Sequence, residues 1–464
     1  MDAQPSDDAR RASLDRRSGA ELDSASDTPL VGVRKKLATE WRRADKILIV
    51  GGIFLINFVI AMDLSATGTI QPRVLSDYNA MTRVGIINTV IYLLIAGIRP
   101  VFAKISDVFG HVQGLLLAML LYTAGFLVCA LARNFSAIFG GTVIAVLGQV
   151  GYSTLVAIIL ADILPIHLRG IITAYTSIPF IVNYYVGIEV GSGLIDKWHW
   201  VYGTLCIMAA VCPLPALFSL FRLDRRARRI LRQEASAGPA PPKQPALRRF
   251  GRVLMELDIP GLLLLCGGCI AILAPLGMQL NTTYGWGSAR VLAPLILGVA
   301  ALAFFVYYEC RLATFPVVPF RLLRTRTFTC AIVAAIFFYF TLNASLFYFN
   351  AFIQVTREVS ARTAMLMQPG FVGYYVGLIL GGWAMQFSKR YRRWAWLGWA
   401  MWLVAVCLMI RSRGSSGASN AEIVVVQALL GVGSGIVIGC VGIGVQASVG
   451  AVDLPIAITL YGMV

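Results

Sequence analysis

Two carboxylates lie inside long apolar stretches of the chain, where an ionisable side chain is energetically costly. Asp63 is part of "AMDLSATGTIQP" (61–72), and Glu189 is part of "YYVGIEVGSGLI" (184–195). Because a low-dielectric environment favours the protonated form of a carboxyl group, both residues are predicted to bind and release protons near neutral pH. The alternatives are a structural hydrogen bond from Asp63 to a neighbouring helix, and an interfacial position for Glu189 that is already in water.

A charged break interrupts the apolar pattern at "KISDVFGHVQ" (104–113). Gly110 permits a tight reversal of the chain, and Asp107 can cap the N-terminus of a neighbouring helix or pair with an arginine. Arg99 precedes the break, and we expect it to extend toward the polar surface or to pair with Asp107 rather than to contact a substrate. An incidental polar turn between two helices is the alternative interpretation.

A set of uncharged polar and aromatic side chains lies on otherwise apolar segments and is predicted to line a wet central cavity. The alternative role for each of them is packing between helices. The set is Asn57, Tyr92, Gln149, Tyr152, Asn183, Tyr184, Tyr339, Asn343, Tyr348 and Gln427.

Metal, nucleotide and enzyme chemistry are not indicated by the sequence. None of the three histidines combines with carboxylates or thiols at metal-ligand spacing. The glycine-rich run "GVGSGIVIGCVGIG" (431–444) mimics a phosphate-binding loop, but it lies within an apolar stretch with no strand before it, so it predicts close helix packing. The nine cysteines are interpreted as small apolar residues, and no bound cofactor is expected.

The elements that must position these residues are membrane helices. The 464 residues are 58% hydrophobic and only 14% charged, so lipid rather than a water-soluble core must cover the apolar surface. Stretches of about 20 apolar residues suit a helix that crosses the bilayer. We predict an all-α polytopic membrane protein with spans at 47–68, 84–103, 112–132, 137–161, 169–194, 201–221, 258–279, 290–308, 328–352, 364–387, 394–411 and 422–446, and a further span that begins at Leu454.

Basic residues concentrate in alternate loops, which predicts their cytoplasmic location. The net charge of +17 therefore reflects topology, and the chain is not expected to bind nucleic acid. Asn281, in an Asn-Thr-Thr sequon, then lies outside and is a candidate glycosylation site. The predicted organisation is a disordered cytoplasmic tail (1–46), a six-helix half (47–221), a basic linker (222–257), two inserted helices (258–308) and an incomplete second half (309–464).

The segment "AKISDVFGHV" resembles the loop signature of the major facilitator superfamily, in which a carboxylate and a glycine help to hold one half of a rocking transporter. This copy keeps Asp107 and Gly110, whereas Val108 and His111 occupy positions where arginine is common. The resemblance implies two pseudo-symmetric helical halves and assigns Asp107, Gly110 and Arg99 to a gating loop.

A narrower resemblance covers nearly the whole chain. The segments "LGQVGYSTL", "KWHWVYG", "LDIPGLLLL", "FPVVPFRLLRTRTF", "YFNAFIQVTREVSARTA" and "LMIRSR" are, in order and spacing, similar to the fungal siderophore-iron transporters, a 14-helix branch. Compared with a 14-helix transporter, the last two helices are missing from the predicted spans, which predicts a truncated chain. The resemblance implies proton-coupled uptake of ferric siderophores by a monomer that acts by alternating access, in the plasma membrane or alternatively in endosomal vesicles.

Two other functions on the same fold stay open. The 14-helix drug:proton antiporters typically carry an arginine in the fourth helix and a proline in the fifth-helix glycine motif. Here "IFGGTVIAVLGQVGYS" has no arginine and no proline follows Gly187, so uptake is favoured over efflux. A nutrient sensor that no longer transports is the second alternative.

Overall fold

The computed structural model shows an all-helical protein. It describes residues 43–80, 84–163, 166–236, 258–277, 285–312, 322, 325–346, 349–359, 361–388, 391–414, 419–449 and 454–463. Throughout these ranges the regular structure is helical, with no strand. The predicted all-α class is confirmed, as expected for a chain in lipid, because a helix satisfies its own backbone hydrogen bonds.

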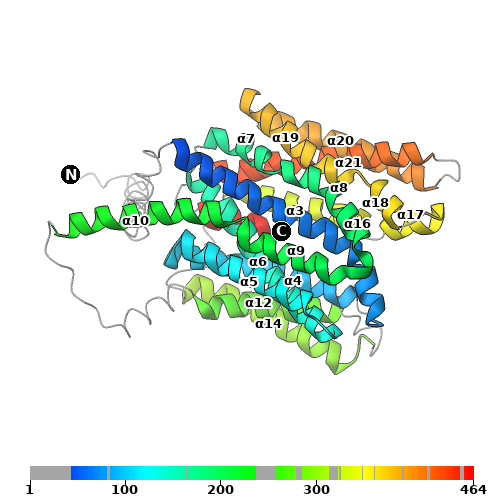
Figure 1. The fold of residues 1–464 in the computed structure, drawn as a ribbon, viewed down its shortest axis with the longest axis horizontal. Helices are drawn as coiled ribbons and strands as arrows, with labels where there is room; N and C mark the ends of the chain where they lie inside the picture. Colours follow the sequence, from blue (N-terminus) through cyan, green and yellow to red (C-terminus); the bar gives the residue numbers. More distant parts are fainter. Residues whose placement is uncertain are drawn as a thin grey trace, which may run out of the picture.

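The helices lie roughly side by side along one axis (Figure 1). The first group comprises α3 (Arg43–Asp77), α4 (Val84–Phe109), α5 (His111–Ala130), α6 (Phe135–Ile163), α7 (Ile166–Thr176), α8 (Ile178–Gly193), the 3-10 turn η2 (Ile195–Lys197), α9 (Trp198–Val211) and α10 (Leu214–Ser236). We call the end of the bundle from which α10 extends the inner end, because it is the predicted cytoplasmic side. The opposite end, where α8 ends, is the outer end.

The remaining helices follow the basic linker. They are α12 (Ile259–Gly277), α14 (Ala289–Arg311), α16 (Arg326–Leu346), α17 (Phe349–Arg357), α18 (Ala361–Leu366), α19 (Gly370–Ser388), α20 (Tyr391–Gly414), α21 (Asn420–Ala447) and α22 (Leu454–Met463).

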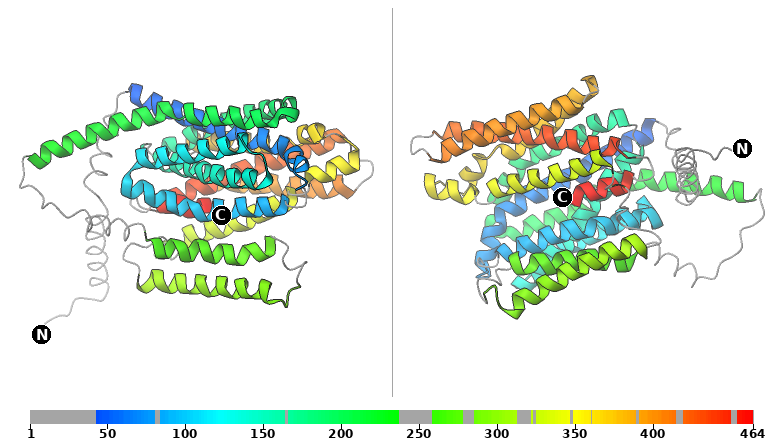
Figure 2. Two further views of the ribbon diagram at one scale, coloured as in Figure 1. Left: turned by 60° about the horizontal axis from the view of Figure 1, so that its bottom comes forward. Right: turned by 180° about the vertical axis from the view of Figure 1, so that it is seen from behind.

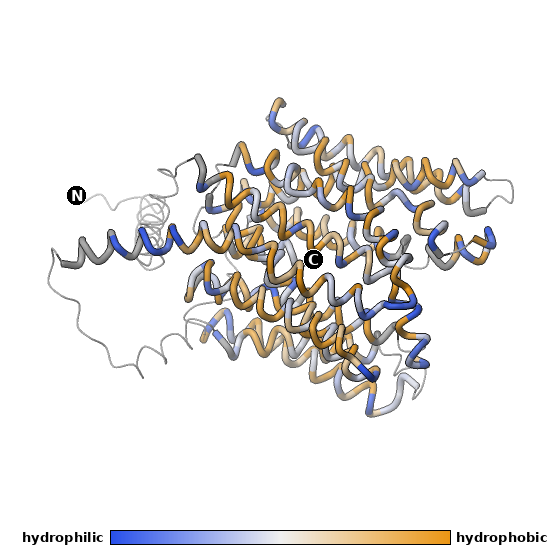
Figure 3. Tube along the Cα trace, in the orientation of Figure 1, coloured by the Kyte–Doolittle hydropathy of each residue, from blue (hydrophilic) through white to orange (hydrophobic). Residues whose placement is uncertain are grey.

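Membrane-spanning length and hydropathy agree with the predicted spans. Among the described residues, eleven helices are long and apolar enough to cross a membrane, and Pro260–Pro275 is a shorter apolar helix at the position of another predicted span. Figure 3 shows hydrophobic residues along the bundle and hydrophilic residues on the projecting part of α10. The first span is longer than predicted, since it continues to Asp77 instead of ending at residue 68.

Two of the predicted spans are broken helices, and a proline accounts for each break. The span predicted at 169–194 divides at Ser177, and Pro179 lies in the first turn of α8. The span predicted at 201–221 divides at Cys212 and Pro213, between α9 and α10. Proline has no N–H to donate within a helix, so it is accommodated at or before the first turn of a new one.

The bundle contains two main hydrophobic cores. The larger one is built from α3, α5, α6, α9 and α10, and includes the fully buried Tyr122 and Tyr152. The second one joins α16, α17, α20 and α21 around Phe338 and Trp402. The helices α12 and α14 lie at one side of the bundle, and α22 lies between the two groups (Figure 2). We call α3–α10 the first half, α16–α22 the second half, and α12 with α14 the inserted pair, in line with the predicted organisation.

Glycines allow the closest helix pairs. A methyl group added at Gly148 of α6 would collide with the backbone of Tyr122 on α5, and one added at Gly435 of α21 would collide with the backbone of Tyr374 on α19. The predicted packing role of the 431–444 run is therefore confirmed.

Candidate functional site

The carboxylate of Asp63 is the centre of a polar cluster inside the first half. It accepts hydrogen bonds from Oγ1 of Thr67 at 2.7 Å and from Oη of Tyr122 at 2.8 Å. A third donor is Nε2 of Gln149, at 3.3 Å. The donors come from α3, α5 and α6 and are all uncharged, and no ion pair of the described residues includes Asp63. The charge of this cluster is therefore set by the protonation of Asp63.

The depth of Asp63 follows from the length of α3. Asp63 lies sixteen residues after Ile47 and fourteen residues before Asp77, the two ends of the first span. This position is the middle of the span, whereas in the predicted span 47–68 Asp63 lies only five residues from the end. The packing of α5 against α6 at Gly148 fixes Tyr122, which is fully buried and points its phenol at the carboxylate.

The predicted proton carrier Glu189 has a different environment. Its side chain is 53% exposed near the outer end of α8, and it pairs with Arg362 of α18, whose Nε lies 3.1 Å from Oε1 of Glu189. This exposed, paired position corresponds to the interfacial alternative. It also links the two halves, because α8 belongs to the first half and α18 to the second.

Tyr184, predicted to line a cavity, makes a second link between the halves. Its hydroxyl donates to the carbonyl oxygens of Met365 at 2.9 Å and Gln368 at 3.2 Å. Its ring also stacks on Phe371 of α19, with 5.3 Å between the ring centroids. One turn further inward, α8 and α19 meet again through a second stacked aromatic pair, and these contacts close the outer part of the junction.

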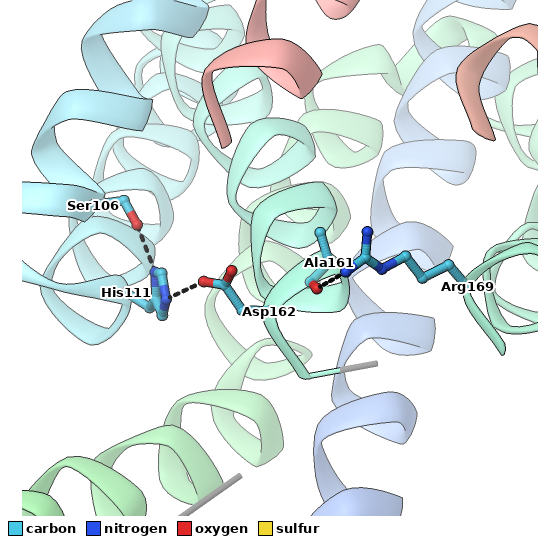
Figure 4. A network of polar contacts seen from close by, with 5 residues as sticks. All are labelled: Ser106, His111, Ala161, Asp162 and Arg169. Carbon is cyan, nitrogen blue, oxygen red and sulfur yellow. Dashed lines mark hydrogen bonds and ion pairs between the residues drawn. The ribbon is translucent and has the colours of Figure 1, made fainter. Parts of the chain in front are cut away.

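Polar contacts at the inner end surround the break at Gly110. Gly110 has φ of 103°, a left-handed conformation that glycine adopts without strain, which confirms its predicted role in the turn. His111 lies 2.6 Å from Oγ of Ser106 through Nδ1 and 3.1 Å from Oδ2 of Asp162 through Nε2 (Figure 4). The histidine thus ties together the inner ends of α4, α5 and α6. The side chain of Asp107 lies outside the described residues.

Arg169 on α7 makes the inner contact between the halves. Its Nη2 donates to the carbonyl oxygen of Ala161 at 2.6 Å, as Figure 4 shows, and its Nη1 lies 3.4 Å from Oε1 of Gln446 on α21. Close by, the backbones of Gly170 and Gly382 are nearly in contact, so that α7 packs directly on α19. The halves therefore meet at both ends of the bundle.

Several predicted cavity residues instead bond neighbouring helices. Nδ2 of Asn57 donates to Thr176 O and Nδ2 of Asn183 to Phe58 O, each at 2.8 Å. These bonds hold α3 against α7 and α8. The other two residues of this kind are Tyr152, which donates to Ala209 O at 3.2 Å, and Gln427, which is buried with its amide 4.0 Å from Sδ of Met409.

The rest of the predicted set is dispersed. Tyr92 is 57% exposed on α4, and Asn343 is exposed and bonds the carbonyl of its own helix. Tyr339 is partly buried on α16 and lies near Arg99 of α4. Tyr348 and Asn281 lie outside the described residues.

Sequence reasoning missed some of the residues that complete these contacts. Tyr122 is the clearest case, and the signal was present, since it is a phenol inside a predicted apolar span. Asp162 and Arg362 were missed because their importance depends on partners from distant segments. The C-x-x-C spacing of Cys266 and Cys269 was also passed over; both are free thiols on α12, and Sγ of Cys266 lies 3.0 Å from the carbonyl oxygen of Gly97.

Comparison with known sequences gives a consistent result. The sequence profile of the Major Facilitator Superfamily matches residues 53–314. Siderophore transporter fer7 of Mycosarcoma maydis is 31% identical over 327 residues, which cover 66% of this chain and 49% of the relative. MFS siderochrome iron transporter C of Aspergillus fumigatus is 26% identical over 465 residues, covering 96% of this chain and 74% of the relative. Siderophore iron transporter 1 of Schizosaccharomyces pombe is 25% identical over 422 residues, covering 89% of this chain and 66% of the relative.

The chain thus spans from about half to about three quarters of the length of these relatives. Among solved structures, the proton:xylose symporter XylE is similar with a TM-score of 0.52 and 14% identity, covering 90% of this chain and 85% of that one. The fucose:proton symporter FucP of E. coli has a TM-score of 0.50 and 13% identity, and the match covers 90% of this chain and 87% of that one. At these identities the structural likeness concerns the fold alone. All of these relatives are transporters and none is an enzyme.

Proposed function

The chain belongs to the Major Facilitator Superfamily, and we propose that it is a proton-coupled importer of ferric siderophores. Its relatives named for siderophore transport match most of its length, which supports this class of substrate. The siderophore supplies the ligands of the iron, so the protein needs to recognise only the outer surface of the complex. Amide, phenol and aromatic side chains suit that surface, which is rich in carbonyl oxygens.

The observation that carries the proton coupling is the environment of Asp63. A carboxylate at mid-membrane with only neutral donors around it has no cation among the described residues to balance its charge. Ionised Asp63 is therefore tolerated only while water or substrate reaches it, and protonation neutralises the site. In the proposed cycle, Asp63 takes a proton from the outer side together with substrate binding and releases it to the inner side.

The contacts between the halves suit alternating access. Near the outer end, α8 contacts α18 through an exposed ion pair and a phenol; at the inner end, α7 contacts α21 through a side-chain contact and packs on α19. The exposed ion pair is weak enough to break during rocking of the halves, since such pairs contribute about 0–1 kcal/mol. We place the carrier in the plasma membrane as a monomer.

Uptake by cells tests the substrate. Yeast lacking its own siderophore importers is transformed with this protein and given a hydroxamate siderophore loaded with radioactive iron. Iron accumulation and growth on that siderophore as the sole iron source are the expected results. Resistance to unrelated amphiphilic drugs without iron uptake would instead assign the protein to the antiporters, and surface expression without either effect would support a sensor.

A further inference from the structure

Arg99 lies deep in the bundle. Helix α4 continues to Phe109, so ten residues separate Arg99 from its inner end, or about 15 Å at 1.5 Å per residue. Asp107 is eight residues further along the same helix, about 12 Å along its axis; its side chain lies outside the described residues, so the pairing between the two stays a prediction. The expectation that Arg99 reaches the polar surface at the loop is therefore replaced by a position inside the membrane.

The neighbours of α4 direct Arg99 toward the second half. Gly97 faces α12, since its carbonyl oxygen accepts from a thiol of that helix. Phe102 packs its ring on Gly151 of α6. On the remaining face, Nη1 of Arg99 lies directly against Gly462 of α22, so that a methyl group there would collide with it. Figure 2 shows α22 between the two groups of helices, which places the guanidinium at their junction.

The guanidinium has no compensating charge among the residues that the structure describes. Nε of Arg99 is buried and has no hydrogen-bond partner, and no ion pair includes this residue. Arginine stays protonated in proteins, so it cannot avoid the free-energy cost of an uncompensated charge by losing its proton. A partly buried cation whose Nε is buried without a partner suits a site whose anionic partner arrives from outside.

Phenols from three helices of the second half surround the same region. Tyr339 of α16 lies near Arg99 and shares a side-chain hydrogen bond with Tyr374 of α19. Tyr461 of α22 precedes Gly462 in sequence and donates to the carbonyl oxygen of Ile438 at 3.1 Å. All three phenols are only partly buried, so they retain surface for a ligand.

We propose that Arg99, Tyr339, Tyr374 and Tyr461 form an anion-binding subsite that receives a negatively charged oxygen of the transported complex. The substrate class is then a ferric siderophore that bears a free carboxylate or another ionised oxygen, and not merely a neutral complex. The guanidinium fork binds a carboxylate through two parallel hydrogen bonds. In the Tyr339–Tyr374 pair one hydroxyl proton is shared between the two phenols and the other is free to donate to a neighbouring oxygen, while Tyr461, which donates to Ile438 O, borders the subsite. This inference rests on the proposed function and adds the charge of its substrate.

The proposal predicts a preference that can be measured without any mutation. N-acetyl and N-succinyl ferrioxamine B share one iron cage and differ mainly in a terminal carboxylate. The purified protein in detergent is titrated with each complex while quenching of its tryptophan fluorescence is recorded. The carboxylated complex should bind at least about tenfold more tightly, as expected for a charge-assisted hydrogen bond.

Variants assign the preference to Arg99. Arg99→Gln should bring the two dissociation constants within about threefold of each other by weakening only the carboxylated complex, and Arg99→Lys should keep part of the preference. Gel filtration and thermal melting show whether each variant is folded, and Tyr339→Phe, which removes one hydroxyl, serves as the milder variant. It should weaken the carboxylated complex selectively, by a smaller factor.

The outcomes separate this inference from the proposed function. Equal binding of the two complexes by the wild type, or equal weakening of both by Arg99→Gln, would overturn the anion subsite and leave Arg99 as a packing residue between α4 and α22. The proposal of siderophore import would survive either result. Binding of neither complex by the folded wild type would overturn both proposals.

Discussion

Replacement of Asp63 with Asn isolates the proton from the rest of the cycle. The amide oxygen of the variant still accepts the hydrogen bond of Tyr122 at 2.8 Å, and its size is unchanged, so the packing of α3, α5 and α6 should persist. What is lost is the ability to alternate between a charged and a neutral state. Asn mimics the protonated acid, and all three surrounding donors are neutral, so the cluster is permanently uncharged.

The size of the effect follows from the driving force. For one proton per substrate, a pH difference of one unit contributes about 1.4 kcal/mol, a tenfold accumulation ratio. A membrane potential of 100 mV adds about 2.3 kcal/mol for one net charge moved. The wild type should therefore concentrate substrate at least tenfold across one pH unit, whereas Asp63→Asn should equilibrate it to a ratio of about 1 when no potential is applied.

Vesicles with a preset pH gradient provide the assay. Accumulation of labelled ferric siderophore is measured with and without the gradient, and exchange of internal for external substrate is measured without it. The variant should lose accumulation and keep exchange, because the neutral form still permits the conformational change. Glu189→Gln is the matched control and should accumulate like the wild type. Accumulation that responds to pH in Asp63→Asn would refute the assignment of the proton to this residue.

Three further substitutions address other parts of the molecule. Asp107→Asn should leave the protein inserted but slow transport, measured as the initial uptake rate at equal surface expression; an unchanged rate would remove Asp107 from gating. Glu189→Gln breaks an ion pair whose carboxylate is 53% exposed, so the melting temperature of the purified protein should change little, consistent with about 0–1 kcal/mol for such pairs. A large loss of stability would show that this pair is a principal clamp. Gly148→Ala should lower the melting temperature by the equivalent of about 1–3 kcal/mol, because its methyl group would collide with the backbone of Tyr122. The matched Gly140→Ala on the same helix, where nothing lies within 4 Å, should be nearly neutral, and equal effects of the two would contradict the close α5–α6 contact.

The sequence predicts the helices well because the bilayer imposes their length. Hydropathy alone located the spans, whereas the orientation taken from the basic residues stays a prediction. The errors lie where local features act within a span: Pro179 and Pro213 divide two of the predicted helices, and polar residues after residue 68 did not end α3, which continues to Asp77. In this part of α3 the apolar face with Ile70 and Val74 is buried in the bundle, whereas Arg73 and Asp77 lie on the exposed face and pair with each other.

The site is only partly predictable, for a physical reason. Asp63 and Gln149 could be singled out because a polar side chain in a membrane span is energetically costly unless it has a polar partner. The structure brings the two within hydrogen-bonding distance. Which residues meet across the two halves depends on docking between segments far apart in sequence. Arg99 illustrates the difference: its type was readable, whereas its depth in the bundle and its contact with Gly462, 363 positions later, were not.

Proton movement during substrate uptake tests the central claim most directly. The purified protein is reconstituted into vesicles that contain a pH-sensitive dye and no initial gradient, and a ferric hydroxamate siderophore is added outside. Proton-coupled import predicts acidification of the vesicle interior that accompanies entry of the labelled iron complex and is absent in Asp63→Asn. Entry of the complex without a pH change, or alkalinisation of the interior, would contradict symport.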